Sequence, residues 1–332
     1  TEAPERIVID ECSFQQQRFH VVVSNTQTRI VNNTGSCSRV LNFNGSDRSI
    51  FGAQALVADT TSRLFVYGES GVFITEPIDG VFGELSDFTS TTTDIQFAVN
   101  DDGSEISNQA YATNNAGGVK LRTLNADGSN TNVSAFNVIG LIGKTLIGFF
   151  PATSKTGFGI TSETPSKMYH FNFGGETVTA TELGSVGDTA LGISCARLAC
   201  ETETSCSISN TETLGCAVSA FDSEEIHPVF FSDVVTNAAS TPTFNFSAPI
   251  PGIKTAAPYT KSNANGQLVI ATVNDNEIGK VLLTIRDASG TEVQTAEFFL
   301  TAFEGTTGFA GTGSSIVMME PSAEYPNGAV RI

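Results

Sequence analysis

A strand that recurs along the whole sequence constrains this chain more than any other feature. Each copy is a short run of β-branched and aromatic residues, and the copies can be marked by seven anchor residues: His20, Phe65, Tyr111, Phe158, Ile208, Val269 and Val317. The intervals between successive anchors are 45, 46, 47, 50, 61 and 48 residues. Because one short group of strands cannot bury its own faces, a chain of this kind must stack its copies.

The clearest copy is the stretch 63–85. Its apolar runs predict three strands, Leu64–Tyr67, Val72–Thr75 and Val81–Leu85. The residues between them, 69–71 and 77–80, contain the Gly, Ser, Pro and Asp that are typical of tight turns. The local pattern is therefore an antiparallel meander.

A period of about 40 to 50 residues made of short strands is typical of propeller blades. We therefore predict an all-β fold, a single domain over residues 1–332 that forms a seven-bladed β-propeller of four-stranded antiparallel blades. On this repeat the chain resembles the β-propeller superfamily over nearly its whole length. It contains no Trp, so the Trp-Asp ending of WD40 blades, the Trp-terminated Asp-box of sialidases and the Trp-docking repeats of quinoprotein dehydrogenases are missing.

Three departures from the repeat carry further predictions. The strand-like segment Arg6–Asp10 is expected to close the ring, as the outer strand of the last blade or the inner strand of the first. The 61-residue interval predicts an insertion at about 234–258, between blades five and six, which is either a spacer or a functional loop. The apolar stretch Val138–Phe150 is interrupted by three glycines, so it predicts a strand pair and not a helix.

The charge excludes some partners. The net charge is −18, so the surface lacks the Lys and Arg that bind phosphate backbones, and neither nucleic acid nor an anionic membrane is an expected partner. Only 16% of residues are charged, which favours an extracellular setting. The chain begins at Thr1 without an apolar leader, as a mature chain after signal-peptide removal would. We expect an extracellular, cell-surface or periplasmic protein without membrane insertion.

The six cysteines are interpreted as three disulfides, because none forms a Cys-x-x-Cys motif and no adjacent His completes a metal site. Cys12 and Cys37 form one predicted pair near the ring closure. Three pairings are open for the other four, of which we favour Cys195 with Cys216 nested around Cys200 with Cys206.

Catalytic motifs are absent from the sequence. There is no Gly-x-Ser-x-Gly and no His-Glu-x-x-His, and the three histidines are scattered. His20 lies in an apolar strand and is interpreted as structural, whereas His170 and His227 are expected on exposed outer strands. The glycine-rich run 305–313 lacks the Lys of a phosphate-binding loop and is interpreted as a crowded inner strand.

An acidic turn is the best metal candidate. It offers several hard oxygen ligands, as calcium prefers, from Asn100, Asp101, Asp102, Ser104 and Glu105. The spacing does not fit an EF-hand, and Asp-Gly is also common in hairpin turns for conformational reasons alone.

Two functions from different classes follow. The poverty of catalytic groups favours a secreted or cell-surface binding and assembly module without enzymatic activity, whose partner is a protein, a glycan or further copies of the chain. The alternative is a secreted, cation-dependent hydrolase or lactonase-like enzyme with its site at the mouth of the central channel. That alternative requires Asp or Glu side chains from at least three blades to converge.

Overall fold

The protein was analysed as a computed structural model. The structure describes residues 19–23, 28–32, 38–41, 50–57, 62–69, 71–75, 83–84, 91–100, 105–114, 120–125, 136–173, 177–198, 213–220, 225–232, 243–251, 258–274, 280–299, 308–312, 315–320 and 329–331. Every element in these ranges is a β-strand. Among them there is no helix of the length and apolar character needed to cross a bilayer.

The strands fall into consecutive antiparallel sheets, which we call blades one to seven. Blade one holds β1 (Phe19–Val23), β2 (Thr28–Asn32) and β3 (Ser38–Leu41), and blade two holds β4 (Ile50–Val57), β5 (Ser62–Gly68), β6 (Gly71–Thr75) and β7 (Gly83–Glu84). Blade three holds β8 (Thr92–Val99), β9 (Glu105–Asn114), β10 (Lys120–Asn125) and β11 (Phe136–Ile139), and blade four holds β12 (Leu146–Pro151), β13 (Thr156–Thr161), β14 (Lys167–Asn172) and β15 (Val178–Ser185).

Blade five holds β16 (Ala190–Leu198), β17 (Thr213–Ala220), β18 (Glu225–Ser232) and β19 (Thr243–Phe246), with β20 (Ile250–Pro251) also paired to β18. Blade six holds β21 (Tyr259–Ser262), β22 (Leu268–Asn274), β23 (Lys280–Arg286) and β24 (Glu292–Phe299). Blade seven holds β25 (Gly308–Thr312), β26 (Ser315–Glu320) and β27 (Ala329–Arg331).

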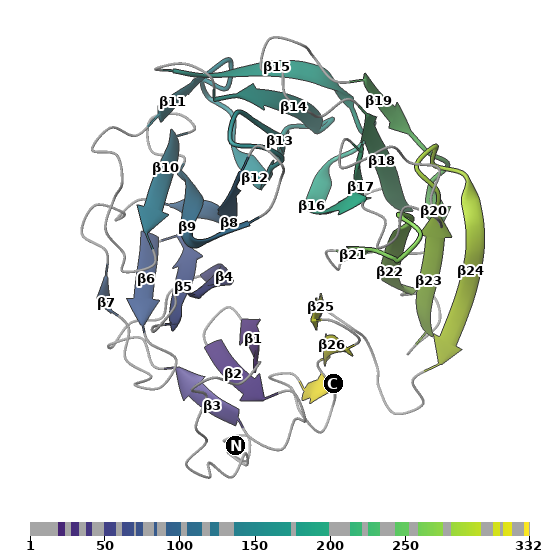
Figure 1. Ribbon diagram of the computed structural model, residues 1–332, viewed down its shortest axis with the longest axis horizontal. Helices are drawn as coiled ribbons and strands as arrows, with labels where there is room; N and C mark the ends of the chain where they lie inside the picture. Colours follow the sequence, from purple (N-terminus) through teal and green to yellow (C-terminus); the bar gives the residue numbers. More distant parts are fainter. Residues whose placement is uncertain are drawn as a thin grey trace.

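The blades follow one another around a common axis (Figure 1). The first described strand of each blade is the innermost of those described, and these strands contact one another in order, β1 with β4, β4 with β8, β8 with β12, β12 with β16, β16 with β21 and β21 with β25. The arrangement is a β-propeller, as the repeat predicts. The seven groups of described strands are consistent with the predicted number of blades.

Blades three and four are also joined at the outer rim. Strand β11 pairs in parallel with β15, with Val138 opposite Val178 and Ile139 opposite Thr179. The two four-stranded blades therefore form one eight-stranded sheet. The stretch Val138–Phe150 does contain two strands, as predicted, but they belong to different blades and do not pair with each other.

The repeat locates most strands correctly. The three strands predicted within 63–85 correspond to β5, β6 and β7. Five of the anchor residues lie in the second strand of a blade, and His20 lies in β1, the first described strand of blade one. The anchor Ile208 and the segment Arg6–Asp10 lie outside the described residues, so closure of the ring by that segment stays a prediction.

The segment 234–258, predicted as an insertion, contains two strands of blade five. Residues Val229–Ser232 of β18 pair with β19, and Glu225 and Ile226 pair with β20. These parts of the segment extend the fifth sheet at its outer side. The other residues of the segment are only partly described.

Much of the apolar core lies between neighbouring blades. Phe65 of blade two packs with Ile95 of blade three, and Phe158 of blade four packs on Phe231 of blade five with ring centroids 4.2 Å apart. Leu268 of blade six belongs to a cluster with Phe230 of blade five. Blade five is thus covered on both faces, by blade four and by blade six, which explains why its strands alternate only partly between apolar and polar residues.

Glycines allow the blades to approach closely. A Cβ atom on Gly159 of β13 would lie 2.7 Å from both Leu146 Cδ1 and Phe171 Cε2, and a Cβ atom on Gly215 would lie 2.9 Å from Leu268 Cδ2. Such distances are shorter than any ordinary contact between carbon atoms. At these positions the packing between strands and between blades has no room for a side chain.

The substitution Gly159→Ala tests this packing. Because both contacts are with buried side chains, we expect it to lower the free energy of unfolding by about 1–3 kcal/mol in urea titrations. The control is Gly143→Asn, at an exposed position with φ +75° and no atom within 4 Å of the added Cβ, where Asn is tolerated. An unchanged midpoint for Gly159→Ala would contradict the close packing.

Candidate functional site

A projecting apolar turn lies where blades three and four meet. The connection between β11 and β12 turns tightly, with the amide of Lys144 donating to the carbonyl of Leu141 at 3.2 Å. Gly140 and Gly143 adopt φ values of +101° and +75°, which glycine reaches without strain. The turn places Leu141 in the core and Ile142 at its tip, where 87% of Ile142 is exposed.

A second isoleucine extends the exposed apolar surface. Ile139, at the end of β11, is 53% exposed although its backbone pairs with Thr179 of β15. The turn is pressed against that strand, because a Cβ atom on Gly140 would lie 2.7 Å from the carbonyl oxygen of Ala180. The two isoleucines are therefore presented on a fixed backbone, and we call residues 139–142 the isoleucine turn.

Charged side chains border the isoleucine turn. Lys144 Nζ lies 3.0 Å from Glu163 Oε1, donates to the hydroxyl of Tyr169, and sits 5.0 Å from the centre of the Tyr169 ring. Lys167 Nζ lies 2.9 Å from Glu182 Oε2, and the Tyr169 hydroxyl also reaches Glu182 Oε2 at 3.5 Å. Two lysines and two glutamates thus form a neutral cluster around one tyrosine.

The same contacts explain the electrostatics of the cluster. The hydrogen bond to Tyr169, together with the carboxylate of Glu163, raises the pKa of Lys144. The hydrogen bond from Lys167 lowers the pKa of Glu182. These shifts favour the charged forms of Lys144 and Glu182, and because the ion pairs are partly exposed their contribution to stability is small.

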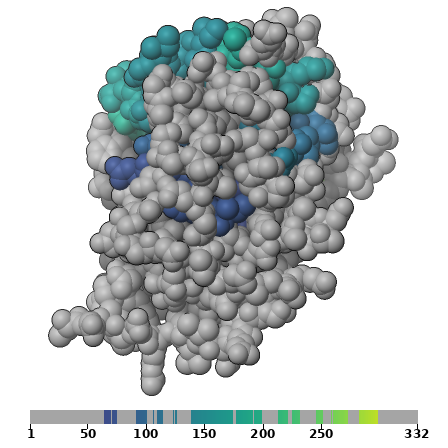
Figure 2. Space-filling model, turned by 90° about the vertical axis from the view of Figure 1, so that its left-hand side faces the viewer, coloured from purple at the N-terminus to yellow at the C-terminus, as the bar shows by residue number. Residues whose placement is uncertain are grey.

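The isoleucine turn and its charged border have the composition of a binding surface. Exposed apolar side chains surrounded by paired charges are typical of contact sites for other proteins. In Figure 2 the teal segments, which include blade four, lie along the upper edge of the molecule and face solvent on that side.

A buried carboxylate joins three blades near the axis. Asp94 of β8 accepts hydrogen bonds from the backbone amide of Phe149 in blade four at 2.9 Å, from Gln96 at 3.0 Å and from the hydroxyl of Tyr67 in blade two at 3.3 Å. Burial raises the pKa of Asp94 to about 6, and these hydrogen bonds limit the rise. Burial, with the nearby Asp94 charge, also raises the pKa of Tyr67.

The predicted calcium ligands lie in the turn of the first hairpin of blade three. Val99 of β8 pairs with Glu105 of β9, so the residues between them connect two adjacent strands. Asn100 is exposed, whereas 101–104 and the side chain of Glu105 lie outside the described residues. Within the residues described, no three His, Cys, Asp or Glu side chains are grouped so that they could hold a metal ion. The calcium site stays a prediction.

One predicted disulfide is present. Cys195 of β16 and Cys216 of β17 are directly paired in the sheet, with Cα atoms 4.0 Å apart, and their sulfurs are bonded. Sequence spacing left three pairings open for this cluster, and the strand register selects this one. The other four cysteines lie outside the described residues.

The histidines differ in their surroundings. His170, expected on an exposed strand, is only 5% exposed, because β14 is covered by blade five and its ring lies 5.5 Å from that of Phe158. Burial lowers its pKa. His227 is partly buried, with Nε2 4.0 Å from Glu225 Oε2. The side chain of His20 lies outside the described part of the structure.

Sequence reasoning missed the two features that matter most at this site. Asp94 is one of many acidic residues, and only the register that brings Phe149 and Tyr67 to it distinguishes it. Ile142 sits in the stretch Val138–Phe150, whose pattern predicts a strand pair but not an exposed side chain. The available signal was the pair of glycines on either side of Leu141 and Ile142, which marks a tight turn with two apolar residues inside it.

Comparisons with known proteins identify the fold. The WD40 domain of Toxoplasma gondii coronin matches with a TM-score of 0.56 and 11% identity, over 92% of this chain and 76% of that one. The Cps50 (Swd1) β-propeller domain of Myceliophteria thermophila matches with a TM-score of 0.55 and 12% identity, over 91% and 88%. BBS1N, in complex with ARL6DN, matches with a TM-score of 0.53 and 13% identity, over 95% of this chain and 86% of that one.

The chain spans 60% of the length of a further matched protein, the dihydro-heme d1 dehydrogenase NirN, at 14% identity and a TM-score of 0.49. No protein-family model matches the sequence, and no curated protein matches it. Identities this low show a shared propeller fold and nothing of activity, because propellers serve many functions.

The substitution Asp94→Asn tests the buried carboxylate. Its pKa is about 6 in the folded protein against 3.8 for a free side chain, so folding favours the protonated form. The contribution of Asp94 to the free energy of unfolding rises by about 2 kcal/mol as the pH falls from 7.5 to 4.5. This contribution is lost as the pH rises through 6. Urea titrations at both pH values should show this difference between Asp94→Asn and the unaltered protein. Equal pH dependence in both would show that Asp94 does not titrate in this range.

Proposed function

We propose that this protein is a binding and assembly module without enzymatic activity, and that it binds a partner protein through the isoleucine turn. The observation that carries the proposal is Ile142, a large apolar side chain that is 87% exposed on a backbone fixed by core contacts of Leu141. Removing such a side chain from water in an interface contributes to affinity, and a rigid backbone reduces the entropy lost on binding.

The charged border supports the same proposal. Lys144, Glu163, Lys167 and Glu182 are already paired with one another, so a partner does not have to neutralise them. Paired charges around an apolar centre discriminate against partners with the wrong charge at the rim. We propose a partner with an apolar pocket bordered by polar groups of both signs.

We further propose an extracellular, cell-surface or periplasmic location. The bonded pair Cys195–Cys216 supports it, because disulfides persist in oxidising compartments. The low proportion of charged residues, 16%, is in line with this. A glycan partner has no specific support from the described residues. The alternative of a cation-dependent enzyme would be favoured by carboxylates from three blades meeting at the channel, and Asp94 has no second carboxylate beside it among its hydrogen-bond partners.

The proposal is tested by native mass spectrometry of the protein isolated from its source, together with metal analysis of the same sample. We expect a complex that contains a second protein, with chemical cross-links from Lys144 or Lys167 to that protein. A monomer carrying a stoichiometric divalent cation would instead support the enzyme alternative and contradict the proposal.

The variant Ile142→Glu isolates the surface. Because the side chain is exposed, the free energy of unfolding should change by less than about 0.5 kcal/mol, while affinity for the copurified partner falls at least about tenfold in titration calorimetry. Ala264→Glu, which adds the same charge at an exposed position in blade six, is the matched control and should bind normally. Equal affinity for both variants would show that the isoleucine turn is not part of the interface.

A further inference from the structure

An asparagine at the rim of blade five stands in a modification motif. The sequence Asn245-Phe246-Ser247, at the end of β19, fits Asn-x-Ser/Thr with a residue other than proline in the middle, which is the acceptor motif for N-linked glycosylation. Three further copies of the motif begin at Asn32, Asn44 and Asn132, and their side chains lie outside the described residues. The structure therefore describes the surroundings of the motif at Asn245.

The side chain of Asn245 is exposed to solvent. Its backbone pairs with Phe230 of β18, so the residue has a fixed place in the sheet. The next residue, Phe246, packs against the core cluster that contains Phe158 and Phe231 of blades four and five. Because successive residues of a strand point to opposite faces, Asn245 points away from that cluster. A glycan is bulky and hydrophilic, and this position leaves it in water.

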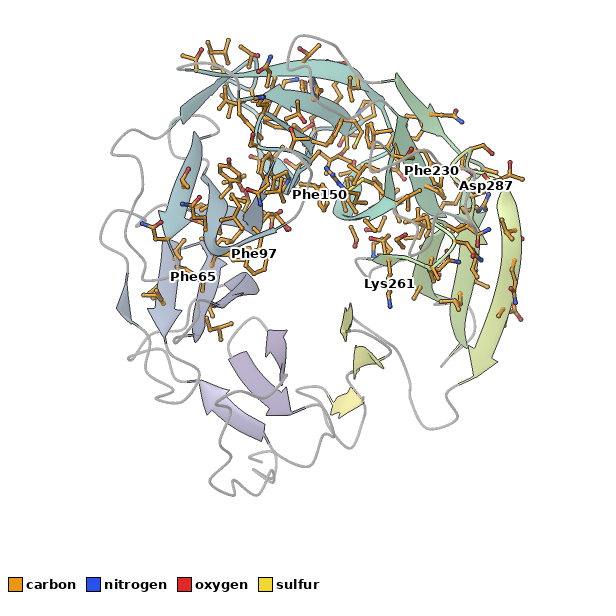
Figure 3. The ribbon with its side chains drawn as sticks, in the orientation of Figure 1. Phe65, Phe97, Phe150, Phe230, Lys261 and Asp287 are labelled. Atoms are coloured by element: carbon orange, nitrogen blue, oxygen red, sulfur yellow. A yellow bond between two sulfur atoms is a disulfide. The ribbon has the colours of Figure 1, made fainter. Side chains whose placement is uncertain are left out.

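The serine of the motif is covered by blade six. The hydroxyl of Ser247 donates to the carbonyl of Gly290 and accepts a hydrogen bond from Arg286 Nη1 at 3.1 Å. Figure 3 labels Phe230 and Asp287 at this junction of blades five and six. The edge of blade six thus covers the third residue of the motif and leaves the first residue exposed.

The serine hydroxyl cannot serve recognition and packing at the same time. The third residue of the motif must be Ser or Thr, so the transferase that reads the motif requires this hydroxyl. In the folded protein the hydroxyl of Ser247 is bonded to Arg286 and Gly290, and the backbone of Asn245 is paired in the sheet. Recognition therefore has to precede the docking of blade six on blade five.

We propose that Asn245 is N-glycosylated, and that the glycan is added before blade six docks on blade five. The donor is an oligosaccharide linked to a lipid diphosphate. The Nδ2 atom of Asn245 forms a bond to the anomeric carbon of the first sugar, and the bond from that carbon to the diphosphate oxygen breaks. The lipid diphosphate leaves, and one amide proton is released to solvent.

The proposal rests on the location proposed above, because N-linked glycans are found on secreted and cell-surface chains. It does not depend on the isoleucine turn as a binding surface. The glycan is a covalent part of the protein on blade five, and the isoleucine turn lies where blades three and four meet.

The chain contains a matched internal control. Residues 244–247 read Phe-Asn-Phe-Ser, and residues 171–174 read Phe-Asn-Phe-Gly, so the two stretches differ only in the last residue. Asn172 lies at the end of β14 and Asn245 lies in β19. Because no hydroxyl follows Asn172 at the third position, Asn172 is not an acceptor. A difference in modification between the two asparagines therefore reports the motif.

The first test is peptide mapping by mass spectrometry of the full chain isolated from its source. We expect most molecules to carry sugar on Asn245, placed by fragmentation of the glycopeptide, and none to carry it on Asn172. Recovery of the Asn245 peptide only at its unmodified mass would overturn the proposal. A bonded Cys195–Cys216 pair in the same digest would leave the proposed location standing, so the two failures are distinguishable.

Three variants of the full chain, expressed in the source, test the motif. Asn245→Gln and Ser247→Ala should each lose the modification, whereas Ser247→Thr, which keeps a hydroxyl, should retain it. Of the two variants without the glycan, Ser247→Ala should have the lower thermal midpoint, because it also removes a hydrogen-bond acceptor of buried Arg286. Sugar that persists on this segment in Asn245→Gln would overturn the assignment to Asn245.

The order of events is tested with a purified oligosaccharyltransferase and its lipid-linked donor. Chain expressed without the transferase is supplied either folded or diluted directly from urea with a reductant. We expect at least about tenfold less transfer to Asn245 in the folded chain, because the junction of blades five and six must open before the motif is accessible. Equal transfer to both forms would overturn the proposed order.

Discussion

Packing between the faces of neighbouring blades holds this protein together, and everything else in the structure depends on it. Phe158 and Phe231, for example, meet only when blades four and five are adjacent. The closeness of the sheets requires glycine at positions such as Gly215, where an added Cβ atom would meet Leu268 of the next blade. Each blade therefore buries apolar surface of the next, and the stability of the protein depends on contacts between blades.

The buried polar groups lie at the same junctions and add specificity to this packing. Asp94 is satisfied only when Tyr67 and Phe149 arrive from the blades on either side, and Arg286 finds Ser247 only across the boundary with blade five. A buried charge without its partners is strongly destabilising, so these groups penalise any misaligned neighbour. Apolar contacts favour stacking in general, and the polar contacts select one alignment.

The fold could be predicted from the sequence because the repeat records it directly. Regular spacing of apolar strands predicted the architecture, and turn residues predicted the hairpins of the stretch 63–85. The candidate site was beyond prediction, since the exposure of Ile142 and the partners of Asp94 arise from contacts between segments far apart in the chain.

Because β11 pairs in parallel with β15, blades three and four are joined more strongly than the other described neighbours. Other described neighbours are held together mainly by side chains, which can separate without breaking a sheet, whereas blades three and four share backbone hydrogen bonds at the rim. Their eight strands therefore form one cooperative folding unit, whose amides should exchange with solvent together. The ring would open elsewhere first, and the isoleucine turn, which follows directly from β11, would keep its shape in a molecule that had already begun to unfold.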